Sequence, residues 1–371
     1  MKITFSLPPF SARPVGGLRV VYEYSNRLIE RGHEVTIVHI LELSDASPGL
    51  YRRLRTSAGR ARRAFSKPNL WWQTLDQGVK VLHLPRRLLA GIPDCDAIIA
   101  TAWTTARPVF DSSASKGMKF YLVQDFDPWI APWEVLQETW RWPLKKITVS
   151  NWLREKVLAS GASPGDTLTI PIAVDHSRFH LTRAIEGRPP RIAMLYGSSA
   201  YKSPEVGLQA LELAKARCAG LEATLFGHGP RPSPIPPWID YRRDLQETDL
   251  VQLYNESALY LCCSLAEGFA LPPAEAAACG SAIVSTDCGG IREYAEPERT
   301  ALLSPPNDSR SLADNIVRLL THEDLRQRLA HAGQERIREF TWEKSTDLLE
   351  RLLGESKPTR NSQPWSRSAD L

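Results

Sequence analysis

The chain has 371 residues, 43% of them hydrophobic and 24% charged, which is typical of a globular protein with buried cores. Its length predicts two domains. The net charge of +4 is too small to indicate nucleic-acid binding, and the apolar run at 258–266 is much shorter than the ~20 residues that span a bilayer. Residues 1–7 run directly into two prolines, so we expect a first strand there, not a signal peptide, in a cytoplasmic protein.

The N-terminal part of the chain alternates between apolar strands and helical periodicity. Residues 2–7 are apolar and β-rich, a Pro- and Gly-rich loop covers 8–17, and apolar residues then recur at helical spacing up to Gly32. Together with the apolar segment 34–40, these elements predict a βαβ unit and therefore a parallel sheet. Further buried strands are predicted at 79–84, 97–101, 120–123 and 147–149.

A second alternation of strands and helices begins at 191–196, after a charged, proline-ended link at 183–190. We therefore expect an N-terminal domain at 1–182, a C-terminal domain at 183–353 and a disordered tail at 354–371. Two such domains place a cleft between the carboxyl ends of two sheets, where ligands bind with phosphates at helix N-termini. The C-terminal domain is predicted to contain helices at 205–216, 247–255, 273–279, 310–320 and 323–339, and strands at 222–226, 258–262, 282–285 and 300–303.

Segment 267–275, EGFALPPAE, carries the strongest chemical pattern. It follows an apolar strand and opens an apolar helix, whose free N–H groups and positive dipole end favour an anion. Gly268 allows the backbone to approach a ligand closely. Glu267 and Glu275 flank the loop, and a carboxylate accepts hydrogen bonds from the neighbouring hydroxyls of a sugar. The segment therefore suits a nucleotide-sugar, although Glu267 could instead cap a turn and Glu275 could lie on a solvated helix face.

The same segment resembles a known family. The E-x7-E spacing within EGFALPPAEAAACG, followed by the CGG at 288–290, is similar to the retaining glycosyltransferases of family four, which have the GT-B fold. Residues 14–17 resemble the family's N-terminal glycine loop, and IPIAVDHSRF at 170–179 resembles its interdomain stretch. The resemblance extends along most of the chain. It implies an α/β, GT-B protein with two Rossmann-like domains facing each other across a cleft. It also implies sugar transfer from a nucleotide-diphosphate donor, with retention of configuration and without a metal.

The resemblance implies roles for particular residues. Glu275 would bind the donor ribose, Glu267 would act at the transferred sugar, and Lys202 would bind the diphosphate, unless Lys202 is only a surface charge. The family's phosphate-binding arginine is replaced here by Ser198 or Ser199. The expected catalytic residues are Glu267 and Asp125, and the expected donor-binding residues are Gly16, Gly17, Ser199, Lys202, Gly268, Phe269, Ala270, Leu271 and Glu275.

Asp125 enters this set because the family's cleft histidine is missing. The corresponding loop at 102–105 contains no His, and the next strand ends at Gln124-Asp125. Asp125 is therefore the candidate contact to the acceptor or the donor sugar, with a solvated loop aspartate as the alternative. Among the histidines, His228 follows a strand and could border the cleft, whereas His33 lies beside a helix end and is expected to be structural.

No metal or cofactor is expected. The D-x-D triplets at 94–96 and 125–127 would allow a manganese-dependent transferase of the other major fold, but that fold would not explain the repeated βα pattern. The six cysteines contain no C-x-x-C spacing, so we expect small buried side chains and no zinc site or disulfide framework.

Two rivals to sugar transfer stay open. One is an epimerase or phosphorylase of the same fold, acting on related sugars. The other is a non-catalytic module that binds a nucleotide-sugar or a membrane surface, an alternative that is kept because the arginine and the histidine are missing. The expected partners of the transferase are a nucleotide-sugar donor and a glycan, lipid-linked or small-molecule acceptor.

Segment 51–67 has an unusual composition, with seven basic residues and no acidic one. Apolar residues accompany them, among them Leu54, Phe65 and the nearby Trp71. This composition suits a basic interfacial helix on anionic lipid, at the inner face of a membrane, and a lipid-linked or polymeric acceptor would fit such a location. A solvated basic loop is the alternative, and no other feature supports nucleic acid.

If segment 51–67 contacts anionic lipid, each basic residue near the surface contributes on the order of 1 kcal/mol, and added salt weakens the attraction. Changing Arg52, Arg53, Arg62 and Arg63 to Gln should then abolish co-sedimentation with anionic vesicles. Turnover of a short soluble acceptor should be nearly unchanged in the same preparation. Equal vesicle binding by the variant, or its inactivity towards the soluble acceptor, would show that the segment is not a membrane contact.

Overall fold

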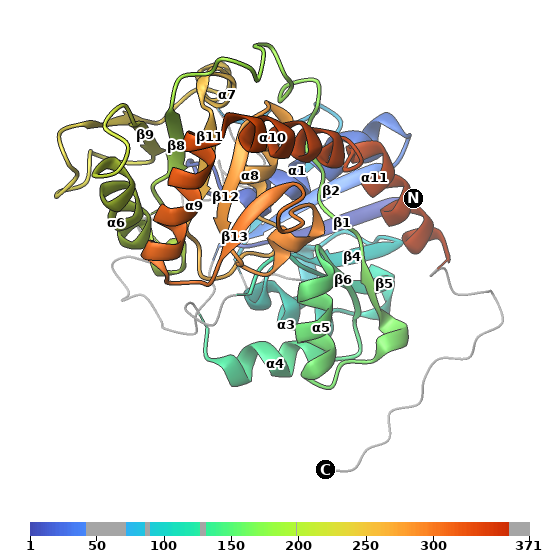
Figure 1. Ribbon diagram of the computed structural model, residues 1–371. Coiled ribbons are helices and arrows are strands. Elements are labelled where there is room, and N and C mark those ends of the chain that lie inside the picture. Colours follow the sequence, from blue (N-terminus) through green and yellow to red (C-terminus); the bar gives the residue numbers. More distant parts are fainter. Residues whose placement is uncertain (42–71, 86–89, 127–130, 198, 356–371) are drawn as a thin grey trace, which may run out of the picture.

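The computed structural model describes residues 1–41, 72–85, 90–126, 131–197 and 199–355. Two parallel sheets organise them (Figure 1), one with the strand order β3-β2-β1-β4-β5-β6-β7 and one with the order β10-β9-β8-β11-β12-β13. This arrangement confirms the predicted pair of Rossmann-like sheets. The strands are β1 (Lys2–Leu7), β2 (Glu34–Ile40), β3 (Lys80–Leu84), β4 (Ala97–Ala100), β5 (Met118–Val123), β6 (Lys145–Thr148), β7 (Thr167–Thr169), β8 (Arg191–Leu195), β9 (Glu222–Gly227), β10 (Ile239–Arg243), β11 (Leu259–Cys262), β12 (Ala282–Thr286) and β13 (Ala301–Ser304).

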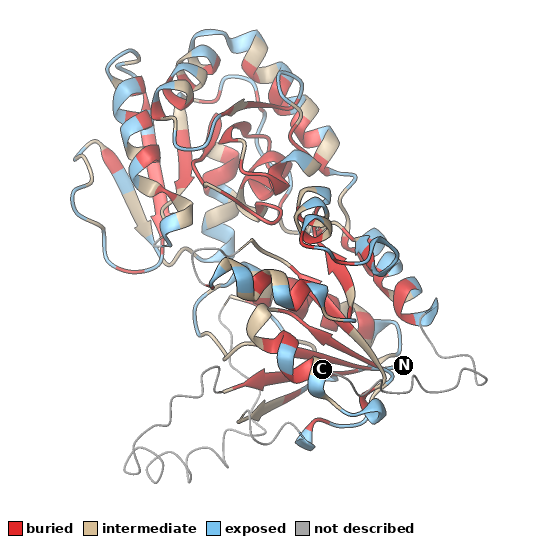
Figure 2. Cartoon of the chain, turned by 90° about the horizontal axis from the view of Figure 1, so that it is seen from below, coloured by how far each residue is buried: buried red, intermediate tan, exposed pale blue. Residues whose placement is uncertain are grey.

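Helices cover both faces of each sheet, so the central strands are buried on both sides (Figure 2) and consist of continuous apolar runs. The order of strands reverses between β1 and β4 in one sheet and between β8 and β11 in the other. Such reversals open crevices at the carboxyl ends of the strands. The helices are α1 (Gly16–Glu30), α3 (Trp103–Asp111), α4 (Trp133–Arg141), α5 (Asn151–Ala159), α6 (Pro204–Lys215), α7 (Glu247–Glu256), α8 (Leu271–Ala278), α9 (Ser309–Thr321), α10 (Glu323–Ile337) and α11 (Trp342–Glu355).

Helix α11 was not predicted, and it returns to the N-terminal half of the molecule. It lies beside α1 (Figure 1). The rings of Trp342 in α11 and Tyr24 in α1 lie 5.1 Å apart. Arg31 Nη1 also donates to Glu350 Oε2 at 2.8 Å. The division of the chain at residues 182 and 183 stays a prediction.

Backbone segments of the two halves approach each other closely at glycines. A Cβ atom on Gly268 would lie 1.9 Å from the carbonyl oxygen of Gln124, and one on Gly289 would lie 2.3 Å from the Trp152 ring. From the sequence, we expected that Gly268 lacks a side chain so that a ligand can approach its backbone. In the structure, the backbone of Gln124 in the N-terminal half is what approaches Gly268 most closely.

Two predicted segments are not part of this description. The basic segment 51–67 lies outside the described residues. The disordered tail was predicted to start at 354, but Gly354 and Glu355 belong to α11, and only residues 356–371 lie outside the described residues. Within the described part of the chain, no helix combines the length and apolar character needed to cross a membrane.

Replacing Gly289 by Ala should destabilise the fold, because the residue has φ of 85° and the new methyl group would meet the Trp152 ring. We expect the free energy of unfolding to fall by about 2 kcal/mol or more. The matched control is Gly354→Ala in α11, where a Cβ has no atom within 4 Å and should be neutral or stabilising. Urea unfolding of the two variants provides the comparison, and equal stabilities would contradict the interpretation of Gly289.

Candidate functional site

A cavity of about 870 Å³ lies between the carboxyl ends of the two sheets. Its volume falls within the range of small-molecule sites in proteins. The structure brings every residue predicted for the site to this one cavity, although their roles stay predictions. Lining residues from the predicted set are Gly16, Gly17, Asp125, Ser199, Lys202, Glu267, Gly268, Phe269, Ala270, Leu271 and Glu275.

The N-termini of two helices meet at the cavity. Helix α8 starts after Ala270, which has φ of 65°, and α1 starts at Gly16, whose Cβ would lie 3.9 Å from the Leu271 side chain. Neither helix has a side-chain cap or an acidic residue in its first turn. Both positive dipole ends are therefore available to an anion.

The start of α8 differs in one respect from the prediction. The helix begins at Leu271, two residues before the predicted start at 273, so Pro272 and Pro273 both lie within its first turn. Proline has no N–H group, so these two positions supply no donor to a ligand. The remaining donors are the N–H group of Leu271 and those of the preceding loop. Tyr294 holds this loop by donating its hydroxyl to the carbonyl oxygen of Ala270 at 2.6 Å.

Lys202 and Glu267 form a largely buried ion pair in the cavity wall. Lys202 Nζ donates to Glu267 Oε1 at 2.6 Å, and Ser264 Oγ donates to the same oxygen at 2.6 Å. Burial opposes the charge on Lys202, but the neighbouring Glu267 carboxylate outweighs it and holds the pKa of Lys202 above its ordinary value. These contacts exclude the two alternatives considered from the sequence, a surface lysine and a turn-capping glutamate.

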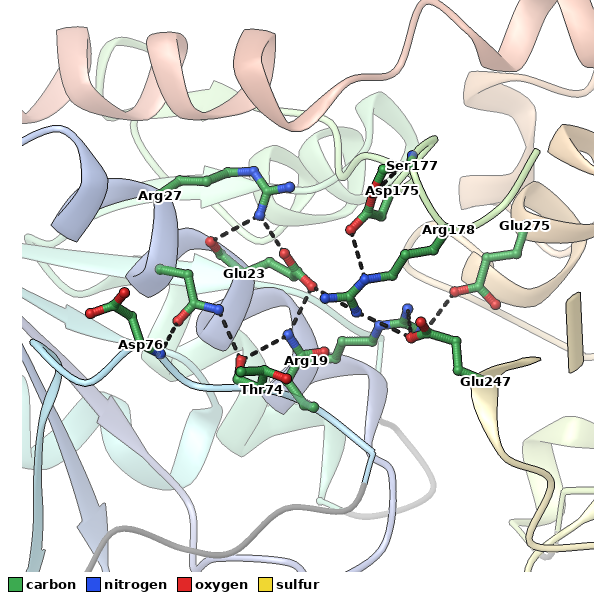
Figure 3. Close-up of polar contacts among 12 residues, drawn as sticks. Arg19, Glu23, Arg27, Thr74, Asp76, Asp175, Ser177, Arg178, Glu247 and Glu275 are labelled. Carbon is green, nitrogen blue, oxygen red and sulfur yellow. Dashed lines mark hydrogen bonds and ion pairs between the residues drawn. The ribbon is translucent and has the colours of Figure 1, made fainter. Parts of the chain in front are cut away.

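Glu275 is paired across the cleft with a residue that the sequence reasoning missed. Arg19 Nη1, from the first turn of α1, donates to Glu275 Oε1 at 2.8 Å (Figure 3). Glu275 is only 5% exposed, so it does not lie on a solvated face. Burial raises the pKa of Glu275 to about 7, although the charge on Arg19 opposes this shift.

Arg19 belongs to a wider network of charges (Figure 3). Its Nη2 lies 3.8 Å from Glu247 Oε2, and Arg178 Nη1 lies 3.1 Å from the same oxygen. Arg178 also contacts Asp175 at 3.0 Å and Glu23 at 3.6 Å. Arg178 and Asp175 belong to segment 170–179, which was singled out in the sequence. The sequence pattern did not predict their ion pairs with Glu23, Glu247 and each other.

Asp125 lies at the carboxyl end of β5, half-buried, with its Oδ1 accepting from the N–H of Phe126 at 2.8 Å. Two further cavity-lining residues of the N-terminal half, Gln73 and Gln124, were not predicted. Each has a buried side-chain oxygen without a hydrogen-bond partner among the described residues. Buried amide oxygens are usually satisfied, and a sugar hydroxyl is a suitable donor for them.

The other polar candidates lie as follows. His228 lines the cavity, where Nδ1 contacts Asp244 Oδ1 at 2.9 Å. The triplet 94–96 precedes β4 and thus lies at the amino end of the sheet, away from the cavity, and Asp94 pairs with Lys116 at 2.9 Å. Asp127 and Ser198 lie outside the described residues. No group of three or more His, Cys, Asp or Glu side chains within the described ranges could hold a metal ion.

Part of the chain matches a known protein family. Residues 242–336 match the family model described as "Glycosyl transferases group 1", and this range includes Glu267 and Glu275. This part of the chain is therefore similar to the glycosyl transferases group 1 domain.

Two curated proteins are similar over parts of the chain. D-inositol 3-phosphate glycosyltransferase of Saccharomonospora viridis is 32% identical over 101 residues, which are 27% of this chain and 23% of that protein. O-antigen biosynthesis protein RfbC of Myxococcus xanthus is 28% identical over 281 residues, which are 73% of this chain and 22% of that protein. The chain thus spans less than a quarter of the length of these relatives.

The fold is similar to solved structures over nearly its whole length. Anabaena Alr3699/HepE in complex with UDP and glucose superimposes with a TM-score of 0.73 at 16% identity, covering 96% of this chain and 100% of that one. At this identity the likeness concerns the fold, and it confirms the predicted GT-B arrangement.

Replacing Lys202 by Met should leave the Glu267 carboxylate buried without its counter-charge. We expect the free energy of unfolding to fall by about 3 kcal/mol. The double variant Lys202→Met with Glu267→Gln should recover most of this loss, because no charge is then left unpaired. Lys80→Met, which breaks an exposed pair with Glu34, should change stability by less than about 0.5 kcal/mol. Urea unfolding measures the stability of the two single variants and the double variant. If K202M lost no more stability than K80M, the buried ion pair between Lys202 and Glu267 would be contradicted.

Proposed function

We propose that the chain transfers a sugar from a nucleotide-diphosphate donor to a glycan, lipid-linked or small-molecule acceptor, with retention of configuration and without a metal. The observation that carries the proposal is the meeting of two uncapped helix N-termini with two buried glutamates, Glu267 and Glu275, in one cavity. The family match and the UDP and glucose bound by the solved relative support it.

In this proposal Glu275 accepts hydrogen bonds from the donor ribose hydroxyls. The diphosphate lies at the N-termini of α1 and α8, near Lys202, with the loop 268–271 and Gly16, Gly17 and Ser199 around it. Negative charge develops on the diphosphate as its bond to the anomeric carbon breaks. Fixed dipoles and a positioned cation stabilise that charge where it forms.

Glu267 is proposed to act at the transferred sugar, whose anomeric carbon becomes positively charged as the diphosphate departs. Asp125 is proposed to contact the acceptor or donor sugar from the N-terminal half. Retention requires the acceptor oxygen to bond to the anomeric carbon on the face that the diphosphate leaves. Gln73 and Gln124 line the same cavity, and their unpartnered side-chain oxygens support sugar binding in it.

The acceptor is proposed to be a glycan or a lipid-linked molecule, which the name of the Myxococcus relative supports. Such an acceptor would fit a cytoplasmic enzyme that contacts an anionic membrane through segment 51–67.

The test is the release of nucleoside diphosphate from a panel of UDP-, GDP- and ADP-sugars, in the presence of candidate acceptors. We expect release with at least one donor, undiminished in excess EDTA, because the dipoles and Lys202 replace a cation. If EDTA abolished this release and manganese restored it, the result would instead favour the manganese-dependent transferase considered for the D-x-D triplets. Binding without release would indicate a binding module. Interconversion of nucleotide-sugars would indicate an epimerase, and sugar release that requires inorganic phosphate would indicate a phosphorylase.

A further inference from the structure

The carboxylate of Glu275 is positioned by a residue of the opposite half of the molecule. Arg19 and Glu275 are 256 residues apart in the chain, and their side chains meet at 2.8 Å. The Arg19 guanidinium also lies 5.3 Å from the centre of the Phe179 ring and 3.8 Å from Glu247. The guanidinium is therefore contacted by two carboxylates and one ring, and Figure 3 shows it between Glu247 and Glu275.

Only one oxygen of Glu275 is used in this contact. Oε1 accepts from Arg19, and Oε2 accepts no hydrogen bond from any residue in the described part of the chain. Since a carboxylate oxygen has two lone pairs, both oxygens keep capacity for a pair of neighbouring hydroxyls. The ion pair is thus compatible with ribose binding and fixes the direction in which the carboxylate can accept.

The charge on Glu275 depends on its surroundings. Burial disfavours the carboxylate and brings the pKa of Glu275 to about 7, Arg19 and Arg178 lower it, and Glu247 raises it. Burial also keeps the Tyr254 hydroxyl and the Cys279 thiol neutral by raising their pKa values. The groups that face Glu275 from the packed elements are Arg19, Arg178, Glu247, Tyr254 and Cys279.

We propose that Arg19 is a positioning residue for the donor: it keeps Glu275 as an oriented carboxylate, so that ribose recognition by the C-terminal half depends on the N-terminal half. This inference rests on the proposed function, because it assigns the ribose to Glu275. It predicts a defect that is specific to the ribose hydroxyls and depends on pH.

The direction of the pH effect follows from the charges. The acidic form of Glu275 predominates below its pKa and cannot accept from both hydroxyls. Removal of Arg19 raises that pKa further, so ribose recognition in Arg19→Gln should be lost at a higher pH than in the wild type. Each pH unit below the pKa reduces the ionised fraction about tenfold.

The experiment measures binding of UDP, GDP and ADP and of their 2′-deoxy counterparts by calorimetry between pH 6 and 9. The wild type should prefer the ribose form of its nucleotide by about tenfold at pH 8, which is the effect expected for a hydrogen bond to a charged group. Arg19→Gln should lose this preference at pH 7.5 and regain it towards pH 9. Arg19→Lys, which keeps a cation, should retain most of the preference at pH 7.5. Glu275→Gln should show no preference at any pH.

Two further variants separate positioning from general stability. Arg27→Gln removes another arginine of α1, one that contacts Glu23 and lies over the Trp342 ring, and should leave the ribose preference and its pH dependence unchanged. Glu247→Gln removes the acid that raises the pKa of Glu275, so the loss of preference should move to lower pH. If Arg19→Gln does not fold, this variant still tests whether ribose preference depends on the ionised Glu275 carboxylate, and an unshifted profile would overturn the proposal.

A uniform weakening of ribose and deoxyribose nucleotides by Arg19→Gln, equal at every pH, would also overturn the proposal and leave Arg19 with a structural role. The proposed function fails by a different result, which is the absence of binding of all three nucleoside diphosphates to the wild type.

Discussion

Two buried carboxylates in one segment constrain the site, because each needs a cation and the segment supplies none. Glu267 takes its cation from Lys202 in the same half of the molecule, and Glu275 takes its cation from Arg19 in the other half. Removing one partner of a buried pair is strongly destabilising, since the remaining charge stays away from water without compensation. The segment 267–275 therefore stabilises the C-terminal half through one ion pair and joins the two halves through the other.

Short contacts between the halves reinforce this electrostatic connection. The Gly268 backbone lies against the Gln124 carbonyl, Gly289 lies against the Trp152 ring, and α11 packs on α1 after the chain has completed the second sheet. Glycines at these points allow backbone contact that any side chain would prevent. The halves thus meet through backbone packing and paired charges around the cavity. A change in their relative position would alter the surroundings of Glu275 directly.

Most strands and most helices could be predicted because hydrophobic periodicity is local, although β7 and β10 were missed. Glu267, Glu275 and Lys202 could be selected because they lie at motif spacings. Arg19 could not be selected, since its partner is 256 residues away and their contact depends on how two sheets face each other. The same holds for Gln73 and Gln124, whose unpartnered oxygens appear only in the folded structure. Helix α11 was not predicted at all, although its buried residues recur at helical spacing. The domain boundary and the residue roles stay predictions.

The charges in the cavity wall also bear on how a diphosphate could be bound. Lys202, Arg19 and Arg178 are all engaged by carboxylates, and prolines occupy two positions where the start of α8 would otherwise offer N–H groups. Within the proposed function, a diphosphate must therefore compete with Glu267 for Lys202. Such competition would release the Glu267 carboxylate as the lysine turns to the phosphates. The freed carboxylate would then be available beside the transferred sugar, so one exchange of partners would serve both of the roles proposed for this pair.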